Sequence, residues 1–204
     1  MKVLVACEFS GRVRDAFIEQ GHEAYSCDFS GSLGKYTDFH LKTNVLNVLE
    51  ATDWDLMIAF PPCTYLAVSG ARWNVDPVRR KKQEKAFAFV KRLIDAPIPK
   101  VAIENPVGRI STMFGMPSQI IHPWQFGHAE AKTTCLWYRQ LPPLRPTKVL
   151  EMPARGYWEN QTPSGQNRLS PSPDRARERS LTYKGIAEAM ATQWGSDKQY
   201  GFFY

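Results

Sequence analysis

The sequence has few cysteines, and their spacing suits neither a metal nor a disulfide framework. The four cysteines stand at positions 7, 27, 63 and 135, with no Cys-x-x-Cys pair and no histidines at the spacing of a zinc site. Structural zinc centres and disulfide scaffolds depend on such spacings. We therefore expect no bound metal, free thiols and a reducing compartment, the cytoplasm.

The sequence also lacks a long hydrophobic run. After Lys2 the first apolar stretch, 3–7, is interrupted by Glu8 and is too short for the apolar part of a signal peptide. No later run approaches the length that spans a membrane. With 204 residues and 43% hydrophobic content, the chain is predicted to be a soluble protein with one domain over 1–204.

Acidic residues are outnumbered by basic ones. The chain has 26 Lys and Arg against 20 Asp and Glu, which gives a net charge of +6 and a pI of about 9.2. This balance favours a polyanionic partner, although it also serves solubility. A helix predicted from Pro77 carries five basic residues on one face: Arg79, Arg80, Lys81, Lys82 and Lys85. That face is either simply solvated or guides a phosphate backbone.

The amino-terminal pattern is typical of the first βαβ unit of a nucleotide-binding fold. A strand is predicted over 2–7, a turn containing Gly11 follows, and an amphipathic helix ends at Gly21. A second strand, 23–28, closes with Asp28. In such folds the first turn and this carboxylate contact the ligand. Because Gly11 stands outside any Gly-x-Gly-x-x-Gly pattern, an ordinary βαβ unit with a surface acid is an equal alternative.

The stretch DLMIAFPPCTY, residues 55–65, places a thiol at the end of a predicted buried strand. The apolar run 56–60 has the composition of a parallel strand, and Pro61 and Pro62 stop it directly before Cys63. Ligands bind at the carboxyl edge of open parallel sheets, and the two prolines fix the backbone that directs the thiol. The alternative is that Cys63 is a small buried hydrophobic residue.

A carboxyl group and an amide occupy the equivalent place on a later predicted strand. This strand begins at Lys100 and breaks at Pro106, with Glu104 and Asn105 at its end. In a parallel sheet these two residues share the edge that carries Cys63. A carboxylate directly after an apolar strand is costly to bury without a partner or a function.

The remaining segments are short or irregular. A loop followed by a short strand or turn is predicted near 43–45, and two strand-like pieces lie within 120–144. The segment 142–173, called the insert below, is rich in Pro, Ser, Asn and Gly and is predicted to be irregular. One closing helix is predicted over 174–195, with a frayed tail after Ser196.

Four features, in this order, resemble the cytosine-C5 methyltransferase family. They are FSG after the first strand, PPC after the strand 56–60, ENP after the strand from Lys100, and a closing helix that follows a Pro-rich gap. The chain looks most like the short, stand-alone members of phages and prophages. The resemblance implies an α/β, Rossmann-like S-adenosylmethionine-dependent methyltransferase fold, with a mostly parallel sheet and helices on both faces. It also implies DNA as the partner, in the bacterial host cytoplasm if the protein is phage-encoded.

The resemblance assigns roles to five catalytic residues. Cys63 is implied to add as a thiolate to carbon 6 of cytosine, and Glu104 to protonate N3, which requires a raised pKa. Carbon 5 then accepts the methyl group. Asn105 is implied to fix its loop and to contact the exocyclic amino group. Pro62 orients the thiol, and Lys132 supplies a positive charge. In a duplex the base must first be flipped out.

The same resemblance implies S-adenosylmethionine as the methyl donor. Its implied contacts are Phe9, Ser10, Gly11, Asp28, Asn44, Pro61 and Gly185. Asp28 is implied to hold the ribose. Asn44 stands where the family usually has an aspartate against the adenine amino group, and its amide oxygen can accept the same hydrogen bond. Gly185 lies in the segment implied to pack beside the methionine end, without the family's Gly-Asn-Ser/Ala-Val signature.

Two departures from the family bear on the substrate. The Gln-x-Arg-x-Arg element is replaced by Ala131–Thr134, whose lysine cannot form a bidentate fork. The large target-recognition domain is reduced to the insert, where basic and aromatic residues are predicted to grip a phosphate backbone and stack on a base. These residues are Arg145, Lys148, Arg155, Trp158 and Arg168. Selectivity is therefore low, or a partner chain supplies it, or the substrate is smaller than duplex DNA.

Two rival functions remain open. The first is the same thiolate chemistry on RNA or a free pyrimidine nucleotide. The second is a catalytically inactive relative that binds DNA or a ligand. The presence of both Cys63 and Glu104 favours an enzyme, because an inactive relative has no need of both.

Overall fold

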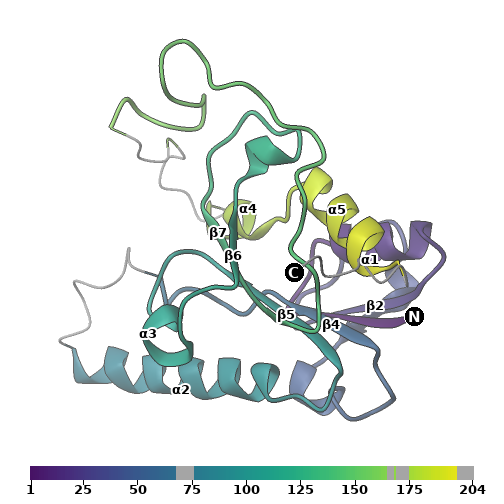
Figure 1. Cartoon of the computed structure of the whole chain (residues 1–204). Helices are drawn as coiled ribbons and strands as arrows, with labels where there is room; N and C mark the ends of the chain where they lie inside the picture. The colour runs from purple at the N-terminus through teal and green to yellow at the C-terminus, as the bar shows by residue number, and fades with distance from the viewer. Residues whose placement is uncertain (68–75, 165–167, 169–174, 197–204) are drawn as a thin grey trace, which may run out of the picture.

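The computed structural model describes residues 1–67, 76–164, 168 and 175–196 (Figure 1). It contains a seven-stranded sheet with the order β3-β2-β1-β4-β5-β7-β6. From β3 to β5 the neighbours pair in parallel, whereas β7 runs antiparallel to both β5 and β6. The strands are β1 (Lys2–Ala6), β2 (Glu23–Asp28), β3 (His40–Lys42), β4 (Leu56–Ala59), β5 (Lys100–Asn105), β6 (Gln119–Ile121) and β7 (Thr134–Arg139).

Helices cover both faces of the sheet. On one face α1 (Arg12–Glu19) and α5 (Lys184–Trp194) lie side by side, and on the other lie α2 (Pro77–Ile94) and the short α3 (Ile110–Phe114) (Figure 1). The short helix α4 (Arg175–Ser180) precedes α5. The predicted fold class is confirmed: an α/β, mostly parallel sheet with helices on both faces.

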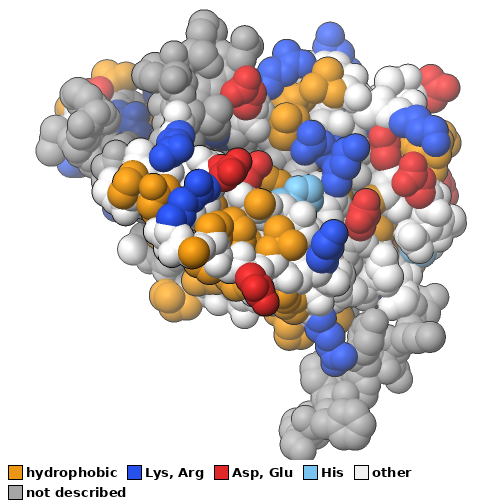
Figure 2. All heavy atoms as spheres, turned by 90° about the horizontal axis from the view of Figure 1, so that it is seen from above, with side chains coloured by type: hydrophobic (Ala, Val, Ile, Leu, Met, Phe, Trp, Pro, Cys, Tyr) orange, Lys and Arg blue, Asp and Glu red, His pale blue; other side chains and the backbone are white. Residues whose placement is uncertain are grey.

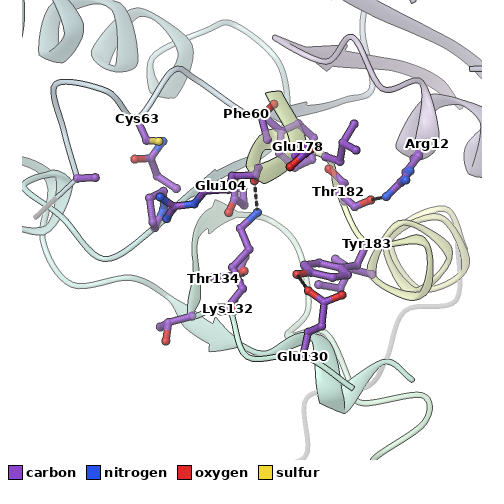
Figure 3. A pocket seen from close by; sticks show the side chains of 18 of the residues that line it. Arg12, Phe60, Cys63, Glu104, Glu130, Lys132, Thr134, Glu178, Thr182 and Tyr183 are labelled. Carbon is purple, nitrogen blue, oxygen red and sulfur yellow. Dashed lines mark hydrogen bonds between the residues drawn. The ribbon is translucent and has the colours of Figure 1, made fainter. Parts of the chain in front are cut away.

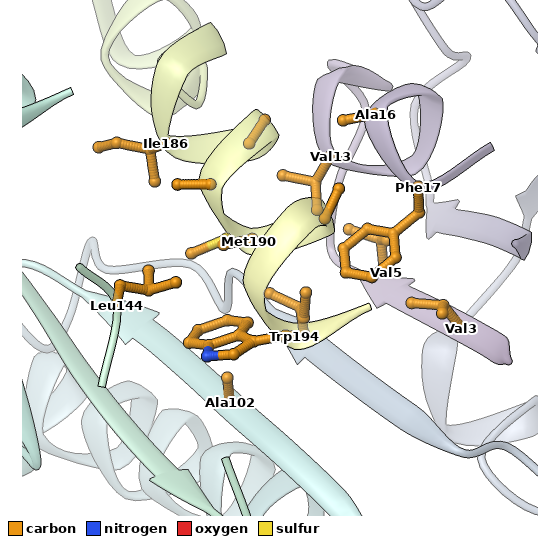
Figure 4. Close-up of a cluster of buried hydrophobic side chains, with 14 of the residues drawn as sticks. Val3, Val5, Val13, Ala16, Phe17, Ala102, Leu144, Ile186, Met190 and Trp194 are labelled. Atoms are coloured by element: carbon orange, nitrogen blue, oxygen red, sulfur yellow. The ribbon is translucent and has the colours of Figure 1, made fainter. Parts of the chain in front are cut away.

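Alternation along the central strands creates two hydrophobic cores. On β1, Val3 and Val5 join the core under α1 and α5, while Leu4 joins the core under α2. Successive strand residues point to opposite faces, so a strand covered on both sides needs apolar residues throughout. Figure 4 shows the first core, in which Met190 and Trp194 of α5 pack toward the strands.

The closing helix predicted over 174–195 is wrong as a single helix. It consists of α4 and α5, which residues 181–183 separate. Tyr183 has an extended backbone, with φ −68° and ψ 136°. The Thr182 carbonyl accepts a hydrogen bond of 2.6 Å from the Arg12 guanidinium rather than from a helical N–H. The tail predicted after Ser196 lies outside the described residues.

The short strand predicted near 43–45 lies slightly earlier, at β3, and Asn44 instead precedes the short helix Val45–Asn47. In its described part, 142–164, the insert contains no helix or strand, as predicted. It is attached to the helices that cover the sheet, because the Arg145 N–H donates to Gln193 Oε1 of α5 at 2.7 Å. Among the helices of the described chain, none combines the length and apolar character needed to cross a membrane.

Candidate active site

A cleft of about 1820 Å³ lies at the carboxyl edge of the parallel strands. It follows the ends of β1, β2, β4 and β5, and so includes the point between β1 and β4 where the strand order reverses. Open α/β sheets bind their ligands at this point. Eight of the predicted site residues line the cleft: Phe9, Asp28, Pro61, Pro62, Cys63, Glu104, Asn105 and Lys132.

Cys63 lies on a turn that α2 holds in place. Its carbonyl accepts hydrogen bonds from the N–H groups of Leu66 and Ala67, both at 2.9 Å. The buried Gln83 of α2 donates its amide to the Tyr65 carbonyl at 2.7 Å. Cys63 itself is exposed on the cleft wall, so its interpretation as a small buried hydrophobic residue is wrong.

The loop after β5 is joined to the loop of Cys63 at two points. Asn105, which is only 1% exposed, donates through Nδ2 to the Pro61 carbonyl at 2.9 Å. The Arg109 N–H donates to the Leu66 carbonyl at 2.7 Å. Gly108 is required beside this bond, because a Cβ there would lie 2.2 Å from the same oxygen. The PPC and ENP sequences therefore form one structural unit.

The surroundings of the carboxyl and of the thiol disfavour the charged form of each. Burial raises the pKa of Glu104, and the charge of Lys132 partly opposes the rise. Cys63 is exposed as a residue, but the protein around its sulfur desolvates the thiolate and raises the pKa of the thiol. The Glu104 charge raises the Cys63 pKa further, whereas the charges of Arg179 and Lys132 lower it. Figure 3 shows Cys63, Glu104 and Lys132 at the same cleft. A protonated Glu104 removes one obstacle to a thiolate at Cys63.

Lys132 is oriented by segments that are distant in the sequence. Its ammonium group donates to the Arg179 carbonyl at 2.8 Å. The preceding residue is held by Asn160 of the insert, whose Oδ1 accepts from the Ala131 N–H at 3.0 Å and whose Nδ2 donates to the Ala131 carbonyl at 2.8 Å. The insert therefore builds part of the cleft wall and holds the residue next to Lys132.

The segment before α5 builds another part of the wall. Tyr183 donates its hydroxyl hydrogen to Glu130 at 2.6 Å, and burial together with this contact raises the pKa of Tyr183 (Figure 3). The Gly185 N–H donates to Nε2 of His128 at 3.0 Å. A Cβ at Gly185 would lie 2.0 Å from the Phe126 carbonyl oxygen. Gly185 does not line the cleft, and close packing explains the glycine there.

Ser10 and Gly11 build the first turn and also do not line the cleft. The Ser10 hydroxyl donates to the buried Glu8 at 2.8 Å. Gly11 has φ +71°, and a Cβ there would lie 2.5 Å from an Arg14 guanidinium nitrogen and 2.6 Å from the Gly34 Cα. Local packing accounts for both residues, and their contact with a methyl donor stays a prediction.

Asn44 and Asp28 differ in their access to the cleft. Asn44 Oδ1 accepts the Leu46 N–H at 3.1 Å, outside the cleft, so its predicted contact with adenine remains a prediction. Asp28 lines the cleft at the end of β2, and its Oδ1 accepts the Ser30 N–H at 2.8 Å. Within the described residues, no group of three or more His, Cys, Asp or Glu side chains is placed to hold a metal ion.

Cys7 and Arg179 are among the residues of the cleft that sequence reasoning missed. Cys7 follows β1 with φ +58°, which is rare for a residue other than glycine and turns the chain toward Phe9. Burial raises the pKa of its thiol to about 12, so the Cys7 side chain is uncharged at physiological pH and forms an uncharged part of the cleft wall. Its position as the last residue of the first predicted strand was an available signal. Arg179 had none, because its place depends on the path of the insert.

Trp158 was expected to stack on a base, and this is wrong. Its side chain is only 3% exposed, so its ring is packed inside the protein and is unavailable to a nucleic acid. The basic residues of the insert are exposed, and of these Arg168 lines the cleft. The insert therefore exposes cations but not that ring.

The strand order, the antiparallel β7 and the position of the cleft define a Rossmann-like methyltransferase fold. Neither a scan against protein-family models nor a search of curated proteins finds a match. A solved structure with this fold is the Entamoeba histolytica methyltransferase EhMeth, which is 14% identical with a TM-score of 0.50. The aligned part covers 76% of this chain and 59% of that one.

Two further solved structures are similar over comparable parts. One is a candidate DNA modification methyltransferase encoded within a prophage (E. coli), with 11% identity, a TM-score of 0.48, and coverage of 74% of this chain and 52% of that one. The other is a Spodoptera frugiperda DNMT2 mutant, with 15% identity, a TM-score of 0.39, and coverage of 74% and 55%. The aligned part spans only about half to three fifths of the length of these structures. At 14% identity, the similarity to EhMeth establishes the fold alone.

Proposed function

We propose that the protein methylates carbon 5 of cytosine in DNA, with S-adenosylmethionine as the methyl donor and Cys63 as the covalent nucleophile. The main support is the pairing of an exposed thiol with a half-buried carboxyl of raised pKa, in one cleft at the ends of β4 and β5. The fold supports methyl transfer in general. The two side chains provide the chemistry that a pyrimidine ring requires.

The β1 and β2 end of the cleft suits the methyl donor. Asp28 offers a carboxylate at the end of β2, from which ribose hydroxyls are bound in related folds. Phe9 contributes an aromatic ring, over which the Arg177 guanidinium lies at 5.2 Å. The cleft of about 1820 Å³ exceeds the roughly 300–1,000 Å³ of ordinary ligand pockets, so a donor and a flipped base fit together. When bound, S-adenosylmethionine supplies an electrophilic methyl group.

Cys63 and Glu104 have different roles toward the base, as the nucleophile and the proton donor. The Cys63 thiolate forms a bond to carbon 6, and the electron pair of the 5,6 double bond is drawn toward N3 as Glu104 donates a proton there. Carbon 5 of the resulting enamine would be nucleophilic toward the methyl group that a bound S-adenosylmethionine would supply, with S-adenosylhomocysteine as the leaving group. Loss of the carbon 5 proton to water, departure of Cys63 as a thiolate and return of the N3 proton to Glu104 would then restore the aromatic ring. The raised pKa of Glu104 keeps the required proton available.

Asn105 serves this reaction through its loop. Its side chain is 1% exposed and its Nδ2 donates to the Pro61 carbonyl, so we assign it to positioning the loop of Cys63. Its Oδ1 has no partner among the described residues and is the atom that would accept from the exocyclic amino group. Pro61 and Pro62 continue the same loop along the cleft wall. Lys132 provides a positive charge near both Glu104 and Cys63, consistent with its proposed place in the catalytic set.

DNA is the substrate that the net charge of +6 favours. Figure 2, which looks down on the molecule of Figure 1 from above, shows Lys and Arg side chains scattered among acidic and apolar ones. The insert adds the exposed cations Arg145, Lys148, Arg155 and Arg168. Scattered cations bind phosphates without reading sequence. We therefore propose that target selection is weak or comes from another chain.

Nucleoside mass spectrometry tests the proposal. Bacteria that express the protein are compared with bacteria that express Cys63→Ala, and DNA, RNA and free nucleotides are digested separately. We expect 5-methylcytosine to rise in DNA only with the unchanged protein. A rise only in RNA or in free nucleotides would move the activity to the first rival. No modified nucleoside in any fraction would favour the binding protein.

A covalent trap provides an independent check. DNA that contains 5-fluorocytosine is mixed with the protein and S-adenosylmethionine. Because fluorine cannot leave carbon 5 as a proton does, the adduct through Cys63 is expected to persist and to appear in a mass spectrum. A donor that binds normally without any adduct on DNA would argue against this substrate.

A further inference from the structure

A positive charge from the carboxyl-terminal part of the chain lies at the cleft of Cys63. Arg179 of α4 lines this cleft together with Cys63 and Glu104. Its carbonyl accepts the hydrogen bond from Lys132 at 2.8 Å, which fixes this part of α4 to the residues that lead into β7. The family arginine is missing from Ala131–Thr134, yet an arginine reaches the same cleft from another element.

We propose that Arg179 is a positioning residue for the reaction described above, with a guanidinium charge that favours the anionic, nucleophilic form of Cys63 against the burial that disfavours it. The inference rests on the proposed function in taking Cys63 as the nucleophile. The need for such a charge follows from the surroundings of the sulfur: desolvation and the Glu104 charge both disfavour the thiolate. Arg179 opposes them more strongly than Lys132 does.

An arginine suits this task better than a lysine at the same cleft. The guanidinium stays protonated at any pH at which the protein is folded, so its effect on the thiolate does not titrate away. Lys132 directs its ammonium to the Arg179 carbonyl and lies 5.8 Å from the centre of the Tyr183 ring. It therefore holds α4 in place as well as contributing charge.

Other charged groups line the cleft, and the test must separate them from Arg179. Arg79 of α2 donates to the Thr64 carbonyl at 3.1 Å and so supports the loop beside Cys63. Glu178 neighbours Arg179 on α4, and both residues are exposed, so water and salt screen both charges. Glu159 and Arg168 come from the insert. The charges that act on the Cys63 thiol are those of Glu104, Arg179 and Lys132.

The rate at which iodoacetamide alkylates Cys63 measures its thiolate directly, without donor or DNA. The full chain is labelled across a pH range of about 6 to 10, and the peptide that contains Cys63 is quantified by mass spectrometry. The variants are Arg179→Gln, Arg179→Lys and, as a control that removes an exposed charge from α2 outside the cleft, Arg92→Gln. We expect Arg179→Gln to be alkylated about 3- to 10-fold more slowly near pH 7, because one pKa unit changes the thiolate fraction about tenfold.

Arg179→Lys is expected to restore most of the rate, and Arg92→Gln to leave it unchanged. In about 1 M salt the difference between Arg179→Gln and the unchanged protein should shrink, because the Debye length falls to about 3 Å. A merely structural role for Arg179 would not produce this salt dependence. Identical pH profiles for Arg179→Gln and the unchanged protein would overturn the inference.

A measurement that leaves Arg179 in place guards against misfolding of Arg179→Gln. In Glu104→Gln, which lacks the opposing negative charge, added salt is expected to raise the pH midpoint of Cys63 alkylation, and a constant or lower midpoint would contradict the inference. The two proposals also fail separately. A normal alkylation shift without methylated nucleosides would refute the proposed function alone, whereas methylation without the shift would refute the role of Arg179 alone.

Discussion

The two ends of the cleft are assembled in different ways. The end at β1 and β2 comes mainly from one continuous stretch, where Glu8 accepts hydrogen bonds of 2.8 Å from both Ser10 and the Val13 N–H. Arg177 of α4 adds a distant contact, with its guanidinium 5.2 Å from the centre of the Phe9 ring. The end at Cys63 combines the loops after β4 and β5 with the insert and α4. Its hydrogen bond from Lys132 to Arg179 joins residues 47 positions apart. The proposed donor end is therefore mainly local, and the proposed base end is composite.

This difference implies that the two ends can be damaged separately. The local end depends on turns that form within a few residues. The composite end depends on the folded path of the whole chain, since even α4 is positioned by contacts with the residues before β7. Variants at one end should therefore leave the other measurable.

The largest effect is expected from the loss of the proposed nucleophile at the base end of the cleft. Cys63→Ala is expected to lower methyl transfer by at least about 10³-fold, because it removes the proposed nucleophile, and to leave the affinity for S-adenosylmethionine unchanged. Asp28→Ala should do the reverse at the donor end and weaken donor binding about 10- to 100-fold, the value of a charged hydrogen bond. Calorimetric titration with the donor and a transfer assay measure the pair. Loss of donor affinity in Cys63→Ala would mean that the ends are not separable.

A second pair of variants tests the packing of the first turn, at the donor end of the cleft. Gly11→Ala is expected to lower the free energy of unfolding by about 2 to 5 kcal/mol, because a left-handed φ of +71° and close contacts with Arg14 and Gly34 act together. Gly21→Ala is the matched control, with φ +81° and no atom within 4 Å of the added Cβ. It should cost only the backbone penalty of about 1 to 2 kcal/mol. Urea unfolding measures both, and equal losses would show that packing at Gly11 is unimportant.

At both ends of the cleft, sequence patterns predict well the elements that depend on contacts close in the sequence. The strand 23–28 matches β2, and the predicted helix from Pro77 begins there because Asp76 accepts the Val78 N–H at 3.0 Å. Cys63 and Glu104 could be placed at one edge because neighbouring parallel strands end on the same side of a sheet. Periodicity and turn residues carry this information within a dozen positions.

The composite end could be predicted only in part. Nothing near Arg179 indicates that it reaches the cleft, and nothing near Asn160 indicates that it grips Ala131, because both contacts depend on the route of an irregular segment. The break between α4 and α5 has a similar cause. The carbonyl of Thr182 is bound by Arg12, which lies 170 positions away. Trp158 looked like a surface aromatic for the same reason.

A smaller effect is expected on the pH dependence of stability, through the half-buried carboxyl of Glu104 at the base end. The pKa of Glu104 is raised on folding, so the folded state holds this proton more strongly than the unfolded chain does. Stability contributed by Glu104 therefore falls as pH rises from the ordinary glutamate value through the raised one. Glu104→Gln cannot ionise. It is expected to melt at a higher temperature than the unchanged protein at pH 7 and at a similar one near pH 4. An equal difference at both pH values would exclude this linkage.

The smallest expected effect is a difference in unfolding free energy between variants of two buried tryptophans, one in the insert and one in the core under α5. Trp194 of α5 is 1% exposed and donates through Nε1 to the Pro142 carbonyl at 2.9 Å. Trp158 of the insert is 3% exposed, but its buried Nε1 has no partner among the described residues. Replacing either ring by phenylalanine removes a similar amount of apolar area, so the difference between the two variants isolates the hydrogen bond.

We expect Trp194→Phe to lose about 0.5 to 1.5 kcal/mol more unfolding free energy than Trp158→Phe, the net value of one hydrogen bond. Trp158→Phe also removes an unsatisfied buried donor, which offsets part of the lost packing. Paired urea titrations with a shared unfolding slope measure the difference. An equal or larger loss in Trp158→Phe would mean that an ordered water or another group satisfies Nε1. The insert would then be bound to the fold as firmly as α5, and the two ends of the cleft would differ in sequence origin but not in rigidity.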